Sequence, residues 1–277
     1  LAPQCYEGMF SGCTSLTRLP VLPATNLFSF CYDSMFKNCM GITLHAVGTA
    51  PTWSIPADVV EATSWNADML AGTGGTFTGD PVPGVTYYYA PPPLPAAGAY
   101  ITFSSTNTFS VTPQSNSWNG ILLASTDATN WVTFTTNGAT AATNATGEYR
   151  LYLSGWGNNR ISDYSTTPAW EIDAADQVAC SGNIESLLDH PKVAAGEEPD
   201  MANYCFANLF KDCTALIRAP ELPAMTLGGH AYHGMFAGCT GLTNAPALPA
   251  TNLTASCYET MFAGCTGLTD TPALPAQ

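Results

Sequence analysis

The sequence predicts a mixed α+β fold, in which a leucine-rich-repeat solenoid in two blocks carries an inserted small antiparallel β-sandwich and a cap. A phrase that begins at Cys5 returns, slightly altered, at Cys31, Cys205, Ala231 and Cys257. Equivalent residues of adjacent repeats are 26 positions apart, a period typical of leucine-rich solenoids. Between the two blocks the apolar residues alternate with a period of two, which predicts strands.

Each repeat is expected to hold a short helix followed by a short extended segment. In the first repeat Cys5, Met9 and Cys13 recur at i, i+4 and i+8, which is one face of a helix. Pro20 and Pro23 limit the extended side to a strand of about three residues, because proline has no backbone donor. Such repeats cannot bury their apolar faces alone, so they are expected to stack on one shared core.

The residues expected in this core occupy the recurring Cys, Met, Phe and Leu positions of the repeat: Cys5, Met9, Phe10, Cys13, Leu16, Leu22, Cys31, Met35, Phe36, Cys39, Cys205, Phe210, Cys213, Leu216, Leu222, Met235, Phe236, Cys239, Leu242, Leu248, Cys257, Met261, Phe262, Cys265, Leu268 and Leu274.

The pattern divides the chain into four segments. Residues 1–40 and 181–277 carry the repeats. Residues 41–97 lose the period but keep short apolar clusters, so we expect a solenoid cap followed by a stiff Pro-rich linker. Residues 98–180 show short alternating stretches separated by turn signals, which predicts a small antiparallel β-sandwich.

The repeat phrase resembles that of a known family. The strings CYEGMFSGCTSLTRLPVLPATNL and CYETMFAGCTGLTDTPALPA are similar to the CYxxMFxGCTxLTxxPxLPATxL repeat of the BspA-like leucine-rich-repeat surface proteins. The resemblance covers residues 1–40 and 203–277. Members of this family are secreted or displayed on the cell surface and are linked to adhesion. The resemblance therefore implies an extracellular, non-enzymatic, structural or adhesive role, and it names no ligand.

The charge balance argues against two classes of partner. The chain has 21 acidic and 7 basic residues, a formal charge of -14, whereas nucleic-acid binding requires Lys and Arg to neutralise phosphates. No apolar run reaches the about 18 residues of a membrane span. The sequence has no signal peptide and no initiator Met, so we expect a processed product or an excerpt of a longer chain.

The two ends of the sequence read as complementary parts of one repeat. Joining residues 271–277 to Leu1 gives LPAQLAPQCYEGMF, one residue shorter than LPATNLTASCYETMF within the chain. Three interpretations are open: an excerpt of a long tandem array, subunits that stack end to end into a filament, or an arbitrary boundary. We expect end-to-end self-association or covalent tandem continuation, because heterologous contacts that do not close form filaments.

The 10 cysteines leave two alternatives. Four pairs lie eight residues apart and could form disulfides within a repeat, which a secreted chain would permit. At Ala231 the first cysteine is replaced while Cys239 remains, which favours small buried apolar groups and free thiols. Cys180 lies outside the pattern and could pair with Cys205 or stay free. A metal is least favoured, because Cys-x7-Cys lacks zinc-site spacing.

Catalytic and metal-binding patterns are weak. His230 and His233 are three residues apart and could bind a metal on one helical face, but the equivalent positions in the next repeat hold Ser256 and Glu259, which indicates a tolerant, solvent-facing column. Glu259 and Asp33 in that column could hold calcium, although the dipole of a helix start favours acidic residues anyway. We therefore expect no metal, no cofactor, no catalytic residue and no enzymatic activity.

Aromatic residues give a second functional hypothesis. Trp118, Trp131, Trp156 and Trp170 lie in the predicted sandwich and could stack on sugar rings, although strand alternation favours packing roles for most of them. Trp156 lies between two glycines and is the one expected to be exposed. The alternative function is a surface or fibre-type binding module that recognises a glycan or a host protein through the β-sandwich.

Overall fold

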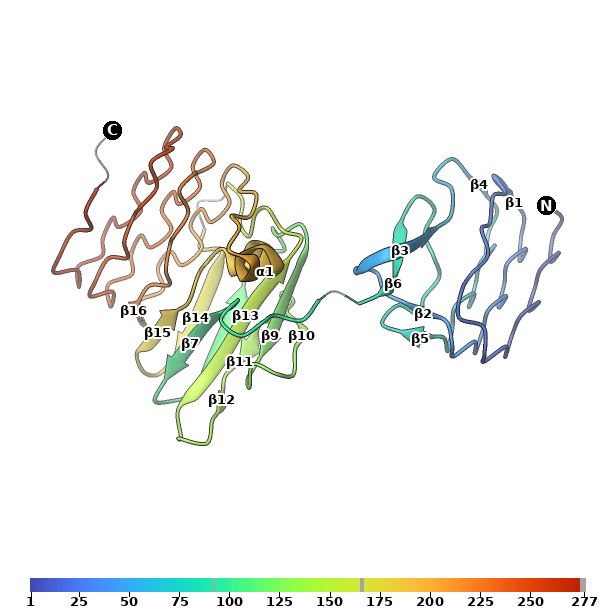
Figure 1. The fold of residues 1–277 in the computed structure, drawn as a ribbon, viewed down its shortest axis with the longest axis horizontal. Helices are drawn as coiled ribbons and strands as arrows, with labels where there is room; N and C mark the ends of the chain where they lie inside the picture. Colours follow the sequence, from blue (N-terminus) through green and yellow to red (C-terminus); the bar gives the residue numbers. More distant parts are fainter. Residues whose placement is uncertain (92, 165–166, 275–277) are drawn as a thin grey trace. The chain divides into compact units, whose positions relative to one another are not determined.

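The computed structural model describes residues 1–91, 93–164 and 167–274. The last three residues of the expected C-terminal part-repeat, and residue 92 of the expected linker, lie outside these ranges. The chain divides into two compact units, Leu1–Pro93 and Leu94–Gln277 (Figure 1). The first unit covers the expected segment 1–40 and residues 41–93 of the segment 41–97, and the second unit covers residues 94–97 and the expected segments 98–180 and 181–277.

The fold is mostly β, with 24% of the residues in strands and 4% in helix, spread over several small sheets. The predicted α+β leucine-rich-repeat solenoid with an inserted sandwich and a cap is therefore wrong. The helix expected in each repeat does not form, since residues 5–13 are a run of turns. The one helix among the described residues, α1 (Ser186–Ala195), lies outside the repeated phrase.

Left-handed backbone positions explain why the phrase does not form a helix. Ser256, Thr260 and Gly264 have φ of 53°, 54° and 75°. A left-handed residue at every fourth position interrupts a right-handed helix and leaves four-residue turns, as where the Met261 N–H donates to the Tyr258 carbonyl at 3.2 Å. The periodicity of the apolar residues therefore came from turns of nearly the same period as a helix.

We call each such stretch a turn ribbon. The ribbons are residues 4–13, 30–39, 64–73, 204–213, 230–239 and 256–265, and their left-handed residues are Gln4, Gly8 and Gly12; Phe30, Ser34 and Asn38; Ser64, Asp68 and Gly72; Tyr204, Asn208 and Asp212; His230, Gly234 and Gly238; and Ser256, Thr260 and Gly264.

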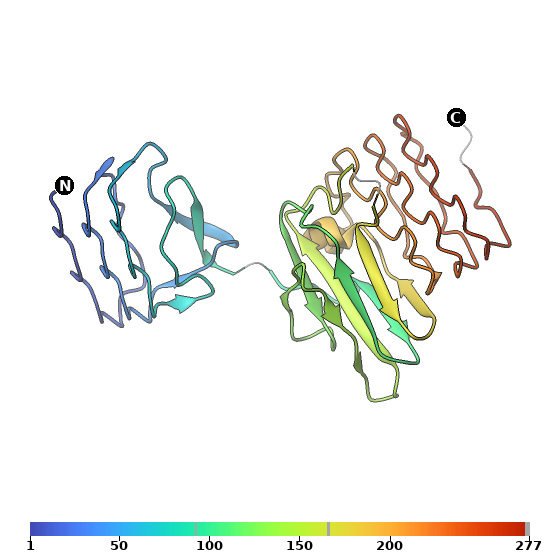
Figure 2. The same ribbon diagram turned by 180° about the vertical axis from the view of Figure 1, so that it is seen from behind.

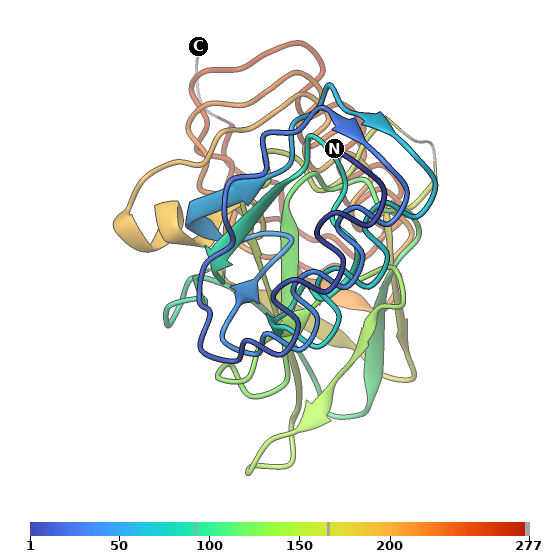
Figure 3. The ribbon, with the colours of Figure 1, turned by 90° about the vertical axis from the view of Figure 1, so that its right-hand side faces the viewer.

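In the first unit three ribbons are hydrogen-bonded to one another in register, and Figure 3 views this unit along the stack, so that its successive loops overlap. The Tyr6 N–H donates to the Cys31 carbonyl at 3.0 Å, and the Tyr32 N–H donates to the Trp65 carbonyl at 2.8 Å. The third ribbon, 64–73, lies in the segment where the sequence pattern predicts a cap. Its Met-Leu-Ala-Gly-Thr is a degenerate copy of the Met-Phe-x-Gly-Cys of ribbons 4–13, 230–239 and 256–265.

Short strands border these ribbons: β1 (Asn26–Leu27) pairs in parallel with β4 (Val60–Glu61), β2 (Thr43–Leu44) in parallel with β5 (Gly74–Gly75), and β3 (Thr49–Ser54) antiparallel with β6 (Thr86–Ala90). Between ribbons and strands lies one core, in which Met35, Phe36 and Ile42 pack with Trp53 and Trp65.

The second unit combines two sheets, helix α1 and three ribbons. Its strands are β7 (Ile101–Ser105), β8 (Phe109–Pro113), β9 (Ile121–Ser125), β10 (Val132–Thr133), β11 (Ala139–Thr140), β12 (Ala142–Thr143), β13 (Tyr149–Trp156), β14 (Trp170–Ala174), β15 (Val178–Ser181) and β16 (Leu216–Arg218). One sheet has the order β10-β9-β13-β7-β15-β16, with β12 beside β13, and the other has the order β11-β8-β14. Helix α1 packs on β13, where Gly155 leaves room for the Leu187 carbonyl.

The sheets and the ribbons of this unit share one continuous core (Figure 2). The Trp170 N–H on β14 donates to the Leu209 carbonyl of the first ribbon at 3.0 Å. The Phe210 ring lies 6.0 Å from the Trp170 ring and 6.1 Å from the Phe103 ring of β7. The sheets therefore form the surface on which the first ribbon of the unit packs.

A first prediction concerns the left-handed residues. Gly72→Ala should lower the free energy of unfolding of the first unit by at least about 1–2 kcal/mol, because φ at Gly72 is 71° and an added Cβ would meet the Asn38 side chain. Gly79 is the matched control, since its φ is not left-handed and a Cβ would lie 3.7 Å from the Phe77 ring. Gly79→Ala should leave stability unchanged or raise it by up to about 1 kcal/mol. Equal losses in urea unfolding would contradict the prediction.

Candidate functional site

The ladder between ribbons runs in one direction only. At each junction the N–H groups of the earlier ribbon donate to carbonyls of the later ribbon. Between the last two ribbons the pairs are Tyr232 to Cys257 at 2.9 Å, Gly234 to Glu259 at 2.9 Å, Phe236 to Met261 at 3.0 Å and Gly238 to Ala263 at 2.8 Å. The two edges of such a stack therefore differ, because one exposes donors and the other exposes acceptors.

Both kinds of edge are present in the chain. Within the described residues, ribbon 256–265 has no ladder acceptor for the N–H groups of Tyr258, Thr260, Phe262 and Gly264. Among the described residues, ribbon 4–13 likewise has no ladder donor for the carbonyls of Cys5, Glu7, Met9 and Ser11. We call these the donor edge and the acceptor edge. They occupy equivalent positions of the phrase, so their spacing matches.

Side chains form columns that follow the ladder. Phe236 and Phe262 stack with ring centroids 5.8 Å apart and an interplanar angle of 4°. Phe10 stacks on Phe36 at 5.4 Å and 7°. At the acceptor edge Met9 is 58% exposed, whereas Met35, its equivalent in the next ribbon, is 3% exposed. A covered ribbon thus buries the side chains that an edge ribbon exposes.

The expected core residues fall into three groups. Buried are Leu22, Cys31, Met35, Phe36, Cys39, Cys205, Phe210, Cys213, Leu216, Leu222, Met235, Phe236, Cys239, Leu242, Leu248, Cys257, Met261 and Cys265. Half-buried are Phe10, Leu16, Phe262 and Leu268. Exposed are Cys5, Met9, Cys13 and Leu274. The exposed and half-buried residues all belong to the first and last copies of the phrase.

All 10 cysteines are free thiols in this structure, including Cys180. The thiols of Cys39, Cys239 and Cys265 each donate to the phenylalanine carbonyl of the preceding ribbon at 2.9 Å, and the Cys213 thiol donates to the Trp170 carbonyl of β14 at 3.5 Å. Burial raises the pKa of the Cys213 thiol to about 12, which keeps it protonated and able to donate. This role accounts for the retention of Cys239 where the first cysteine is replaced by Ala231.

The tryptophans of the two-sheet region differ in their surroundings. Trp170 is buried and packs against Phe134, and Trp118 stacks on the same ring. Trp131 lies against Tyr100. Trp156, at the end of β13, is half-buried and makes no ring contact within the described residues.

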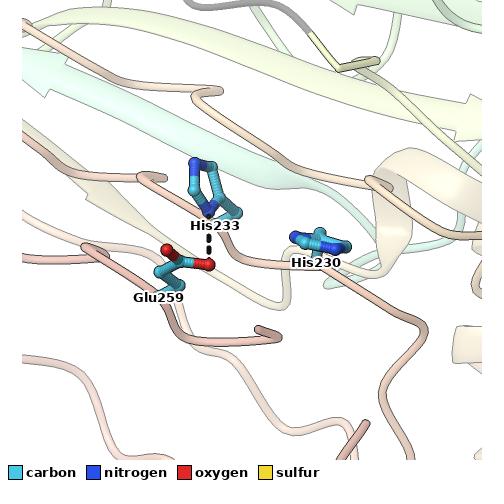
Figure 4. A group of neighbouring side chains, drawn as sticks. All are labelled: His230, His233 and Glu259. Atoms are coloured by element: carbon cyan, nitrogen blue, oxygen red, sulfur yellow. Dashed lines mark ion pairs between the residues drawn. The ribbon is translucent and has the colours of Figure 1, made fainter. Parts of the chain in front are cut away.

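Two adjacent ribbons bring together a cluster of His230, His233 and Glu259, in which one ligand atom from each side chain lies within 4.8 Å of the others (Figure 4). The His233 Nδ1 lies 3.7 Å from a carboxylate oxygen of Glu259. The His230 ring stacks on Tyr204, with centroids 4.6 Å apart. A hydrogen bond from Ser256, and then the two imidazoles, lower the pKa of the Glu259 carboxyl, so this carboxyl stays charged.

The repeat pattern predicted no metal site here, because Glu259 occupies the same position of the phrase as His233, which indicated a tolerant, solvent-facing position. The ladder makes equivalent positions of adjacent ribbons neighbours in space as well. Glu259 is therefore the partner of His233 and not only its equivalent. The sequence signal for this cluster is that His233 and Glu259 are separated by one repeat of 26 residues, with a second histidine, His230, three residues before His233.

No family model, no curated protein and no solved structure matches this chain. The resemblance of the repeat phrase to the BspA-like proteins therefore stays an expectation. Among the described residues, no helix is long and apolar enough to cross a membrane.

A second prediction concerns the thiols. A thiol-reactive chromophore should label Cys5 and Cys13 rapidly in the native protein, because these two are exposed and the other eight are buried. In denaturant without reductant all 10 cysteines should react. Cys5→Ser/Cys13→Ser should abolish the rapid phase and leave the slow one. Fewer than ten reactive thiols in the denatured, unreduced protein would show disulfides instead.

Proposed function

We propose that this protein is a non-enzymatic structural or adhesive repeat protein, located outside the cell or at its surface, in which the ribbon stack continues end to end, either into a second copy of the chain or into a covalent tandem continuation. The observation that carries the proposal is the one-way ladder, which leaves a donor edge and an acceptor edge of matching spacing. The resemblance of the phrase to secreted, adhesion-linked proteins supports the location.

In the proposed junction, the donor edge of one copy meets the acceptor edge of another. The N–H groups of Tyr258 and Phe262 donate to the partner's Cys5 and Met9 carbonyls, repeating the pattern by which Tyr232 and Phe236 donate to Cys257 and Met261. Phe262 stacks on the partner's Phe10 as it does on Phe236. Because the two edges are different surfaces, each copy keeps one edge open, and such heterologous contacts grow into filaments.

The energetics of this junction predict weak association. Each new backbone hydrogen bond contributes about 0.5–1.5 kcal/mol, and burial of a side chain such as Met9 contributes about 1.5–3 kcal/mol. Loss of translational and rotational freedom costs about 4–15 kcal/mol. The opposing quantities are of similar size, so we expect assembly that depends on protein concentration.

A second candidate function is a binding module that recognises a glycan or a host protein through the two-sheet region. The observation that favours it is Trp156, a half-buried indole without an aromatic partner in the described residues. Aromatic faces of this kind stack on apolar faces of ligands.

A third prediction tests the junction by sedimentation velocity. The wild-type protein should sediment as progressively larger, elongated species as its concentration rises. Phe10→Asp and Phe262→Lys should each abolish this growth, because a charge replaces one ring of the proposed stack. The double variant Phe10→Asp/Phe262→Lys should restore it through the opposite charges.

Val132→Asp is the control for this series, since Val132 is 66% exposed on β10 and belongs to neither edge. Growth of the single variants equal to that of wild type would contradict the proposed register. A wild-type protein that stays monomeric at millimolar concentration would contradict end-to-end assembly.

A fourth prediction tests the alternative function on a glycan array. If the two-sheet region binds sugars, the wild-type protein should bind a subset of glycans and Trp156→Ala should lose that binding by about tenfold or more, as expected for loss of an aromatic anchor. Val132→Asp should bind as wild type does. A blank array for the wild-type protein would count against the glycan reading and leave the junction proposal untouched.

A further inference from the structure

We propose that His230, His233 and Glu259 form a binding site for a divalent transition metal, with Zn²⁺ as the ion that fits this ligand set. Two imidazoles and one carboxylate are ligands that zinc takes in proteins, and three protein ligands leave one position for water or an outside ligand. All three ligands come from one copy of the chain, so the site does not require the end-to-end junction to form.

The backbone of the ribbons holds the three ligands in place. His230 is a left-handed residue with φ of 56°, and the turn that follows brings its ring centroid to 5.9 Å from that of His233. Glu259 comes from the next ribbon, whose position is fixed by the ladder bond from the Gly234 N–H to the Glu259 carbonyl at 2.9 Å. Two separate stretches of chain therefore converge on one site.

The histidine nitrogens are unpartnered. Nδ1 of His230 and Nδ1 of His233 are both shielded from solvent and have no hydrogen-bond partner. A buried polar atom without a partner destabilises the fold unless something satisfies it. The distance from His233 Nδ1 to the Glu259 carboxylate oxygen, 3.7 Å, is too long for a hydrogen bond. This carboxylate also makes no hydrogen bond with His230 Nδ1. A metal ion bound by one ring nitrogen of each histidine would give both imidazoles a polar partner.

The geometry can close around zinc with small side-chain movements. Tetrahedral zinc with ligands at about 2.0–2.1 Å requires ligand atoms about 3.3 Å apart, whereas the ligand atoms here lie within 4.8 Å of one another. The Glu259 side chain is 52% exposed, so it can rotate toward the two rings without disturbing the core. The His230 ring rests on Tyr204, which fixes the plane of that imidazole.

The site occurs once among the described ribbons. The positions equivalent to His230 and His233 are Gln4 and Glu7, Phe30 and Asp33, Ser64 and Ala67, Tyr204 and Ala207, and Ser256 and Glu259. None of these pairs supplies two imidazoles, and none places a further histidine beside a carboxylate. One metal ion per chain is therefore expected.

Isothermal titration with ZnCl2 and metal analysis after dialysis test the proposal. All proteins carry Cys5→Ser/Cys13→Ser, so that the two exposed thiols cannot bind zinc. This background should bind one Zn²⁺ per chain, and its melting temperature should rise with zinc concentration because the ion binds only the folded state. Addition of His230→Ala, His233→Ala or Glu259→Gln should weaken binding about tenfold or more.

Glu7→Gln is the matched control, because Glu7 occupies the position of Glu259 in another ribbon and has no histidine neighbour in that column. It should bind zinc as the background does. Co²⁺ substitution reports the ligands directly, since an N/O site lacks the strong thiolate charge-transfer absorption. Less than half an equivalent of zinc bound at about 0.1 mM free metal would overturn the proposal. Unchanged zinc binding by the Glu259→Gln variant would also overturn it.

Discussion

The hydrogen-bond ladder between turn ribbons is the interaction on which the repeated part of this molecule depends. Along a ribbon the backbone N–H groups alternate: one donates to a carbonyl within its own turn, and the next points along the stack and can donate to a carbonyl of the next ribbon. This alternation exists only because a left-handed residue recurs at every fourth position. Without it the phrase would wind into a helix, whose backbone groups bond internally and leave nothing for a neighbour.

The ladder also sets what the side chains can do. Because equivalent residues of adjacent ribbons lie side by side, each position of the phrase becomes a column. Aromatic rings stack on aromatic rings, and Cys39, Cys239 and Cys265 each donate to a carbonyl of the ribbon before. A column tolerates replacements that keep its size, which is why Ala231 substitutes for a cysteine. The same adjacency produces the cluster of His230, His233 and Glu259, where two members of one column and a residue beside them meet.

Direction is the second consequence of the ladder. Since all donors face one way, a stack of ribbons has unlike edges, and a pairing that uses both edges does not close on itself. In the second unit the two-sheet region ends the stack at one side. There the Trp170 N–H of β14 donates to the Leu209 carbonyl, as the N–H of a preceding ribbon would. Folding and assembly therefore draw on the same geometry, and the proposed role as a structural or adhesive protein follows from it.

The sequence by itself determined the positions of the repeats, their spacing and most of the residues that face the core, because burial follows the apolar pattern whatever the backbone does. It also determined the alternating strands β7, β8 and β14, whose inner faces the period of two identifies. The helix was the error: apolar residues at i, i+4 and i+8 fit a helix and a chain of turns equally well. Only the tertiary structure decided between them, because in four of the six ribbons the left-handed residues donate their N–H groups to the neighbouring repeat. The third ribbon at 64–73 and the meeting of Glu259 with His233 also required the structure, since both depend on contacts between stretches that are distant in sequence.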